Sequence, residues 1–496
     1  MNAKHLIFIL SAWFPLGSVL AQTGESDRGR WMYQTEMFGS AASGDYTPFW
    51  LTSNRYGKVP LKAGNGYLRA GSFYNQDFGD GFQWNAGVDL IVAAPRYRNV
   101  YIQQLYAGIT YRAFQLDVGS KEQYYSLWDK DLSSGDMVAS ANARPIPEVK
   151  ISVPAYTLVP GTGKWLYAKG DFSVGRSFDT DYLAHFANGK QTYIKDVLWH
   201  HKSIYFRVES PANRFPLALE LGLQHGAQWG GVSTDPLMGV QPRSVTDFIR
   251  VAMGMGGGDG ASEMDKANVL GNQYGSYDIR LTYKRDDWRL QAYHQRYFED
   301  KSGTIFINGL DGLWGLQMDL PGLPWLQKIL VECLDTRDQS GPFHFIAFDH
   351  EKYPGVGGGA DRYYNNEEYT TGLSYFNRSI GSPLLPSPEY NTDGALGFKN
   401  IRVYAWHLGL AGQFSSRLAY RLLFTTMNSW GTPYRPLLNN KAGTTALLEI
   451  SYSHPRAQGW LFTGSIASDT GSFVEKGVGF GLCISKRGIL PTKPRR

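Results

Sequence analysis

Two segments combine aromatic rings with hydrogen-bonding side chains in stretches that lack a regular pattern. They are residues 47–57 (Thr-Pro-Phe-Trp-Leu-Thr-Ser-Asn-Arg-Tyr-Gly) and 361–369 (Asp-Arg-Tyr-Tyr-Asn-Asn-Glu-Glu-Tyr). Aromatic faces stack on sugar rings, while Asn, Asp, Glu and Arg bind hydroxyl groups. The mixture favours a carbohydrate site, although loop packing and an interfacial aromatic girdle explain it nearly as well. The candidate carbohydrate-binding residues are Trp50, Arg55, Tyr363, Tyr364 and Asn366.

Catalytic and metal chemistry find little support in the sequence. His200 and His201 are adjacent, so on a strand they face opposite ways and cannot share a metal ion. Residues 271–275 resemble a Gly-x-Ser-x-Gly nucleophile motif but carry Gln273 in place of the serine. The glycine-rich stretch 254–260 lacks the Gly-Lys-Ser/Thr ending of a phosphate-binding loop. We therefore expect no enzyme activity, no metal site and no cofactor.

Charged residues also occur on the polar side of strand-like runs. Charge is costly on the lipid side of a membrane barrel, so these residues are predicted to face the lumen: Glu220, Asp278, Arg280, Arg289 and Arg421. A salt-bridged network that holds the barrel in shape is favoured, and a polar path for a solute is the alternative. The residues predicted to face lipid are Trp84, Leu219, Leu221, Ile279, Leu281, Trp288, Leu290 and Tyr420.

An alternation of apolar and polar residues positions all these side chains. In Phe82–Val92 apolar residues alternate with polar or small ones, with Ile91 the one lapse, and Leu217–Gln224 and Tyr277–Lys284 repeat the pattern. About nineteen such runs predict an all-β fold, a transmembrane antiparallel up-and-down β-barrel of about 18 strands with long extracellular loops. The runs include one that begins near Glu368. Because such barrels have an even strand number, at least one run must be wrong, and Trp31–Ala41 is the weakest.

The connections between the runs support an up-and-down order. Short links at 160–164, 211–216 and 285–287 alternate with long ones at 177–202, 230–275 and 339–367. Short periplasmic turns and long outer loops are the usual asymmetry of outer-membrane barrels. Asn377–Asn400 breaks the rule, because it is long where a short turn is due. Either a strand is hidden there, or one large connection faces the periplasm.

Composition agrees with a membrane barrel. Aromatic residues make up 14% of the 496 residues, which fits two interfacial girdles. Hydrophobic content of 43% and mean hydropathy of −0.32 are mild, as expected when only one face of each strand is apolar. A net charge of +5, spread along the chain, argues against nucleic acid as a partner. For Cys333 and Cys483, unpaired side chains on strand faces are favoured over a disulfide.

The chain divides into four parts. Residues 1–21 read as a cleavable signal peptide, with Lys4 before an apolar stretch and a small-residue cleavage site. Residues 22–65 are predicted to be a strand and loop inside or below the barrel, 66–485 the barrel, and 486–496 a basic tail. This organisation predicts an outer-membrane protein that contacts lipid and is inserted by the barrel-assembly machinery.

Four segments, in this order, resemble the Wzi family of outer-membrane capsule-assembly proteins. They are 47–57, Cys-Leu-Asp-Thr-Arg-Asp-Gln-Ser-Gly-Pro at 333–342, 363–369, and Asn-Arg-Ser-Ile-Gly-Ser-Pro-Leu-Leu at 377–385. The likeness spans about Trp31 to Ser485. Two features depart from well-known members of the family. Where those members carry a periplasmic helical bundle, the residues before Gly66 are expected to form a strand and a loop, and the chain continues past the last expected strand, whereas barrels often end on an aromatic residue.

The resemblance implies a barrel of about 18 strands that acts as a non-enzymatic surface lectin. Its expected partner is capsular or another surface polysaccharide, which it would help to hold and organise. A porin or transporter for a polar solute is the alternative. An outer-membrane lipase or deacylase comes third, because no sequence feature recommends it.

Overall fold

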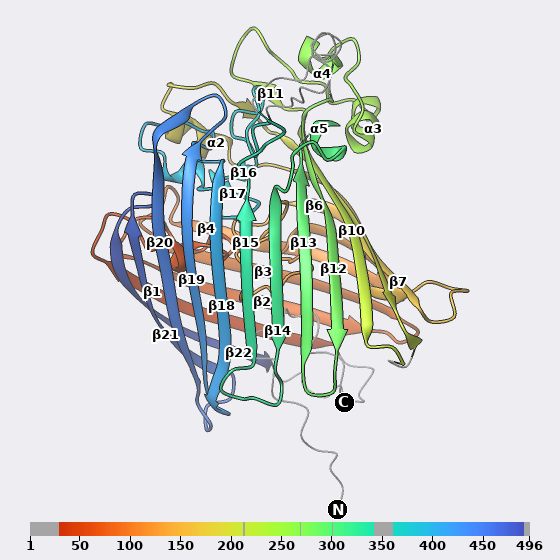
Figure 1. Ribbon diagram of the computed structural model, residues 1–496, viewed down its shortest axis with the longest axis vertical. Coiled ribbons are helices and arrows are strands. Elements are labelled where there is room, and N and C mark those ends of the chain that lie inside the picture. The colour runs from red at the N-terminus through yellow and green to blue at the C-terminus, as the bar shows by residue number, and fades with distance from the viewer. Residues whose placement is uncertain (1–28, 212–213, 268, 300, 342–360, 491–496) are drawn as a thin grey trace, which may run out of the picture.

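The strands follow one another around a closed sheet (Figure 1). The computed structural model describes residues 29–211, 214–267, 269–299, 301–341 and 361–490. Within them, 18 strands form one sheet; each strand pairs antiparallel with the next, and β22 pairs with β1. They are β1 (Arg30–Ala42), β2 (Asn65–Asp77), β3 (Phe82–Ala94), β4 (Val100–Tyr111), β5 (Phe114–Ser120), β6 (Glu148–Leu158), β7 (Leu166–Arg176), β9 (Leu198–Glu209), β10 (Leu217–Trp229), β12 (Asn272–Lys284), β13 (Arg289–Phe298), β14 (Gly312–Asp319), β15 (Lys328–Asp335), β18 (Val403–Ser415), β19 (Leu418–Gly431), β20 (Pro436–Ser453), β21 (Trp460–Gly471) and β22 (Gly477–Leu490).

The remaining elements are short and lie in the connections. The helices are α1 (Phe49–Thr52), α2 (Thr180–Ala187), α3 (Val245–Met253), α4 (Glu263–Ala267), α5 (Lys301–Thr304) and the 3₁₀ turn η2 (Pro388–Tyr390). The two-residue strands are β8 (Ile194–Lys195), β11 (Val232–Ser233), β16 (Ser374–Tyr375) and β17 (Arg378–Ser379). No helix among the described residues is long and apolar enough to span a membrane.

Short and long connections lie at opposite ends of the barrel. Tight turns such as 112–113 and 416–417 join strands at one end, and long loops such as 121–147 and 230–271 emerge at the other. Figure 1 shows α2, α3, α4 and α5 gathered at the long-loop end. The long loops therefore face the cell exterior and the turns the periplasm. The connection 336–402, of which 342–360 lies outside the described residues, belongs to the exterior set.

The extra run among the nineteen is the one predicted from Glu368, and not the weakest one. Glu368 and Tyr369 form a turn in which their N–H groups both donate to Asn366 Oδ1, at 2.9 Å each. An asparagine side chain that satisfies the backbone in this way competes with strand pairing. With no strand there, Asn377–Asn400 belongs to the exterior connection, and neither a hidden barrel strand nor a large periplasmic connection is needed.

The weakest run, Trp31–Ala41, forms β1 and closes the barrel. Residues of β1 pair with β2 on one side and with β22 on the other. The barrel therefore begins at Arg30, inside the segment 22–65 predicted to precede it, and continues to Leu490, past the predicted limit of 485. Pairing between the first and last strands involves no hairpin, so local sequence carries no sign of it. The signal peptide and residues 491–496 lie outside the described residues.

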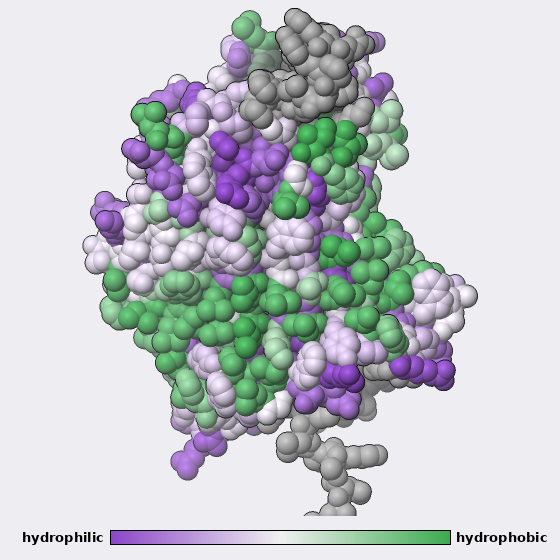
Figure 2. All heavy atoms as spheres, viewed as in Figure 1, coloured by the Kyte–Doolittle hydropathy of each residue, from purple (hydrophilic) through white to green (hydrophobic). Residues whose placement is uncertain are grey.

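The two faces of the strands differ as the alternation predicts. Leu221, Ile279 and Leu281 are 48%, 44% and 45% exposed on the outer wall, whereas Glu220 and Asp278 between them are 1% and 3% exposed. Figure 2 shows the resulting band of hydrophobic (green) surface across the lower half of the face in view. Burial of such a band in hydrocarbon is what holds an outer-membrane barrel in place.

This register makes a prediction about an outward position. Leu221→Arg should lower the free energy of unfolding by about 2–4 kcal/mol, because it places a cation in the apolar band. The matched control is Leu237→Arg, since Leu237 is 95% exposed on the exterior loop 230–271 and should change stability by less than about 0.5 kcal/mol. Denaturant unfolding of both variants in lipid vesicles measures the difference. Equal effects of the two substitutions would contradict the register.

Candidate functional site

The lumen is filled by three exterior segments, 43–64, 121–147 and 361–402, which we call the plug. The first is anchored to the inner wall through α1, where Trp50 Nε1 donates to Thr425 Oγ1 at 3.0 Å. The backbone N–H of Phe49 donates to Asp469 Oδ2 at 2.8 Å. Arg55 forms an ion pair with Glu449. The exterior loop between β1 and β2 is thereby fixed to strands on another side of the barrel.

The second plug segment, 121–147, binds acceptors on the facing strands. Glu332 of β15 accepts hydrogen bonds from Ser133 Oγ and the Ser134 N–H, both at 2.7 Å. Gln295 Oε1 of β13 accepts from the Met137 N–H at 2.8 Å. A buried carboxylate is costly unless it is hydrogen-bonded. Moving this segment away would leave Glu332 without these donors, so the hydrogen bonds stabilise the segment against the wall.

The third plug segment, 361–402, locks the other two together. The Tyr364 hydroxyl donates to the Met137 carbonyl at 2.6 Å and accepts from the Ser382 N–H at 2.8 Å. The Arg378 guanidinium donates to the carbonyl and the hydroxyl of Thr52, both at 3.0 Å. The plug is one interlocked body, and each segment contacts at least one other.

The predicted carbohydrate-binding residues lie in this plug, and their rings are closed off. Trp50 is 2% exposed, and Tyr363 and Tyr364 are each 0% exposed. Without an open ring face, none of the three can stack on a sugar in this conformation. The Arg55 guanidinium forms an ion pair with Glu449, and the Asn366 side chain accepts the backbone N–H group of Glu368 in the turn at 366–369. Composition could not separate stacking on a sugar from packing in a core, because both use large aromatic faces.

The predicted lumen-facing charges line the inner wall, and three of them, Glu220, Arg280 and Arg421, bind the plug or each other. Arg280 pairs with Glu220 and donates to the Leu127 carbonyl of the plug. Arg421 pairs with Glu449 and donates to the Asp131 carbonyl at 2.9 Å. Asp278 accepts from Tyr205 and Gln224, at 3.1 and 3.0 Å. Arg289 pairs with Asp319 near the periplasmic end.

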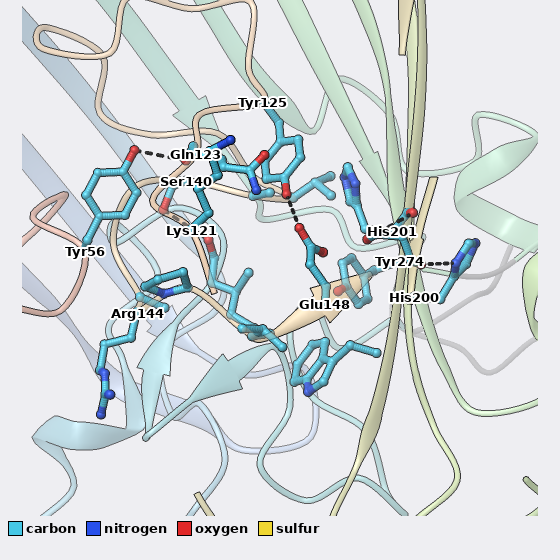
Figure 3. A pocket seen from close by; sticks show the side chains of 18 residues that line it. Tyr56, Lys121, Gln123, Tyr125, Ser140, Arg144, Glu148, His200, His201 and Tyr274 are labelled. Atoms are coloured by element: carbon cyan, nitrogen blue, oxygen red, sulfur yellow. Dashed lines mark hydrogen bonds between the residues drawn. The ribbon is translucent and has the colours of Figure 1, made fainter. Parts of the chain in front are cut away.

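A cavity remains between the plug and the inner wall (Figure 3). Its volume is about 100 Å³, which is room for about three waters. Figure 3 shows Tyr125 and Glu148 pointing toward one another, with the tyrosine hydroxyl donating at 2.9 Å, and His200 and His201 on opposite sides of β9. No group of three or more metal-ligating side chains occurs in the part of the chain described. The cavity is too small for a sugar polymer.

A larger opening lies at the exterior end, and we call it the mouth cleft. It has a volume of about 490 Å³ and is lined by residues that include Tyr46, Tyr390, Asn391, Asn400, Lys441 and Lys476. Four regions far apart in sequence contribute: the first and third plug segments, the start of β20 and the turn after β21. A volume of this size is within the range of small-molecule sites.

The chemistry of the mouth cleft combines aromatic edges, amides and cations. The Tyr46 and Tyr390 rings meet edge to face, with centroids 5.7 Å apart. Burial and the nearby Glu475 raise the pKa of Tyr46, so its hydroxyl stays protonated and can donate to a ligand. Lys399 pairs with Asp393 at 2.7 Å, whereas in the described residues neither Lys441 nor Lys476 forms an ion pair. Among the described residues, the cleft therefore presents two lysines that form no ion pair, with the single carboxylate of Glu475 beside them.

Sequence reasoning missed the mouth cleft, although one signal was present. The run Tyr390-Asn391-Thr392 has the same mixture of aromatic and hydrogen-bonding residues as the two segments singled out above. The lysines carry no such sign, because isolated lysines are common on any surface. Cys333 and Cys483 are both free thiols.

Comparison with known proteins gives both a family and a fold. A sequence profile of the family "Capsule assembly protein Wzi" matches residues 38–385. The structure is similar to Escherichia coli Wzi, described as an outer-membrane carbohydrate-binding β-barrel involved in group 1 capsule assembly. The TM-score is 0.54 at 15% identity, over 91% of this chain and 83% of that one.

Porins are more distant. Pseudomonas aeruginosa OprD has a TM-score of 0.45 at 10% identity, over 94% of this chain and 96% of that one. Acinetobacter baumannii OccAB4 has a TM-score of 0.47 at 10% identity, over 95% of this chain and all of that one. No curated protein sequence matched. Because the profile covers well over half of the chain, the protein belongs to the Wzi family of capsule-assembly proteins and resides in the outer membrane.

Proposed function

We propose that this protein binds surface polysaccharide at the mouth cleft and assists the assembly or attachment of a capsule, without catalysing a reaction. The observation that carries the proposal is the cleft itself, an exterior opening of about 490 Å³ above an interlocked plug. Its tyrosines offer stacking edges, its amides pair with hydroxyl groups, and its lysines attract carboxylates. The membership in a capsule-assembly family supports the same role.

The charge of the cleft favours an acidic polymer. Lys441 of β20 and Lys476 of the turn after β21 line a common opening, so a polymer that carries a carboxylate on each repeat can meet both. Cations in a concave surface concentrate anions and speed their association. The carbohydrate-binding description of Escherichia coli Wzi agrees with a polysaccharide ligand but does not fix its charge.

The plug argues against the alternative function, a channel for a polar solute. Its three segments are tied to the wall and to one another by buried hydrogen bonds, so opening a path would break many of them at once. A solute would also have to pass the ion pair of Arg55 with Glu449, which joins the plug to the wall, and the ion pair of Arg280 with Glu220 on the wall itself.

Conductance separates the two functions. We expect the purified protein in a planar bilayer to pass almost no current, because the lumen is filled. Deletion of 126–142 should open it, since this removes the donors that Ser133, Ser134 and Met137 supply to the wall. The control replaces α3 with a glycine–serine stretch of equal length, which leaves the plug intact. Heat-dependent gel mobility shows that each variant is folded, and an open pore in the unaltered protein would favour the transporter.

The mouth cleft is tested by reversing the charges of its two lysines that form no ion pair with a described residue, Lys441 and Lys476. Each reversal at an exposed site should cost about 1 kcal/mol of binding free energy, so Lys441→Glu with Lys476→Glu should weaken binding of an acidic capsular polysaccharide about thirtyfold. The loss should shrink at high salt, where exposed charges are screened.

The matched control reverses Lys164 and Arg456, which lie in turns at the periplasmic end and give the same net charge. Binding is measured on a glycan array with acidic and neutral polymers, and retention of capsule is measured on cells. Undiminished binding by the cleft variant would place the polysaccharide elsewhere. If the unaltered protein neither bound a glycan nor affected its retention, the proposed function would be wrong.

A further inference from the structure

A second polar opening lies on the outside of the barrel, and we call it the outer-wall pocket. It has a volume of about 650 Å³ and is lined by Leu310, Asp335, Arg337, Asp338, Arg402 and Trp430. Along β18 the buried residues Val403 and Ala405 face the lumen, so the intervening Tyr404 faces outward. The same alternation places Asp335 of β15 and Trp430 of β19 on the outer face. The pocket is thus separate from the mouth cleft and the lumen.

A row of aromatic residues marks the membrane interface below this pocket. Trp314, Cys333 and Trp406 lie side by side on adjacent strands, and the two tryptophans are 42% and 50% exposed on the outer wall. Exposed tryptophans at this position form the girdle of a membrane barrel. Arg337 and Arg402 each lie four residues from this row toward the exterior, which is about 13 Å of strand.

Figure 2 agrees with this position, because a strongly hydrophilic (purple) patch lies above the green band, over the upper ends of β15 and β18. Paler surface of intermediate hydropathy lies between the apolar band and this patch (Figure 2). A lipid molecule packed against the band therefore brings its headgroup to the level of the pocket.

One arginine in the pocket is held rigidly. The Arg337 guanidinium forms two hydrogen bonds with the carboxylate of Asp335, at 2.8 and 2.6 Å. It also lies over the Tyr404 ring, 4.4 Å from the centroid, and 5.7 Å from the centroid of Trp430. These contacts fix one wall of the pocket before any ligand arrives, which lowers the entropic cost of binding.

Two other charges in the pocket have no counter-ion. Arg402 Nε donates to the Arg337 carbonyl at 3.0 Å, and in the described residues Arg402 forms no ion pair with a carboxylate. Asp338 likewise forms no ion pair there. Asp311, which also lines the pocket, accepts the N–H groups of Asp338 and Gln339, at 3.1 and 2.8 Å, so its carboxylate is engaged in shaping the loop. A free guanidinium, free carboxylate oxygens and an aromatic ring thus face one opening.

We propose that the outer-wall pocket binds the anionic sugar headgroup of a glycolipid in the outer leaflet. Arg402 would meet a phosphate or carboxylate of the headgroup, since guanidinium binds both in a forked geometry. Asp335 and Asp338 would accept sugar hydroxyl groups, and Trp430 would contact a ring face. A membrane glycolipid fits better than a free polymer because the pocket opens onto the lipid-facing wall, where acyl chains anchor the headgroup.

The inference does not depend on the proposed polysaccharide binding, since no residue of the mouth cleft takes part. Its test uses the full-length protein in nanodiscs of phospholipid alone and of phospholipid with a phosphorylated lipopolysaccharide. Native mass spectrometry of the protein after mild detergent extraction counts the glycolipid molecules retained. Arg402→Ala combined with Trp430→Ala is the test variant, and Arg402→Lys with Trp430→Phe is the conservative one. Arg435→Ala is the control, because Arg435 is exposed in the neighbouring exterior turn.

We expect the unaltered protein and the Arg435 control to retain the glycolipid and to melt at a higher temperature in its presence. The double alanine variant should retain about tenfold less, since it loses a charge-assisted contact and an aromatic contact. The conservative variant should recover much of the binding, because it keeps the positive charge and the aromatic ring that contact the headgroup.

Equal retention by the unaltered protein and the double alanine variant would overturn the inference. Equal binding of the glycolipid with and without its phosphate groups would also overturn the inference. Soluble, lipid-free polysaccharide is added as a competitor, and displacement of the glycolipid by it would show that the pocket serves a free polymer. Loss of polysaccharide binding at the mouth cleft alone, with glycolipid retention unchanged, would refute only the proposed function.

Discussion

The hydrogen bonding of backbone groups within the hydrocarbon layer determines the rest of this structure. No water is present there, so each N–H and C=O needs a partner inside the protein, and an open sheet edge is excluded. The pairing of β1 with β22 removes the last two edges. The position of every other strand, the separation of the two faces and the end at which the loops emerge follow from that closure. A break in this pairing would expose two edges to lipid.

A closed barrel of this size leaves an interior that must be filled by water or by protein, and here the exterior loops fill it. The wall carries buried carboxylates that face the plug, among them Glu332 and Glu449, which are only 1% and 3% exposed. Such groups are stable only where donors reach them. The plug supplies those donors from serine hydroxyl, backbone and arginine groups, so the charge of the wall and the fold of the loops stabilise each other. The lumen charges act as anchors for the plug.

Filling the lumen moves binding chemistry to the surfaces. With the aromatic residues of the plug buried, two openings of useful size on the described surface are the mouth cleft and the outer-wall pocket. The first faces the exterior along the barrel axis and presents lysines, while the second opens sideways above the lipid and combines arginines with carboxylates. A protein built in this way can hold a polymer at its mouth while its outer wall contacts the surrounding leaflet. The two surfaces share no residues.

Much of the fold could be predicted from the sequence, because the alternation of apolar and polar residues along a strand is a local property. A strand such as Tyr277–Lys284 records in its own residues which side meets lipid, and the family segments kept their order. The candidate carbohydrate-binding site was harder to predict from the sequence. Trp50 and Tyr364 have the composition of a sugar site, yet their burial depends on contacts with residues 375 and 227 positions away. The closing strand β1, the turn at Glu368 and the mouth cleft likewise depend on partners distant in sequence. Local patterns specify which face of a strand is apolar; only the folded chain decides which loops enter the lumen, because that choice is made by hydrogen bonds between segments that sequence does not bring together.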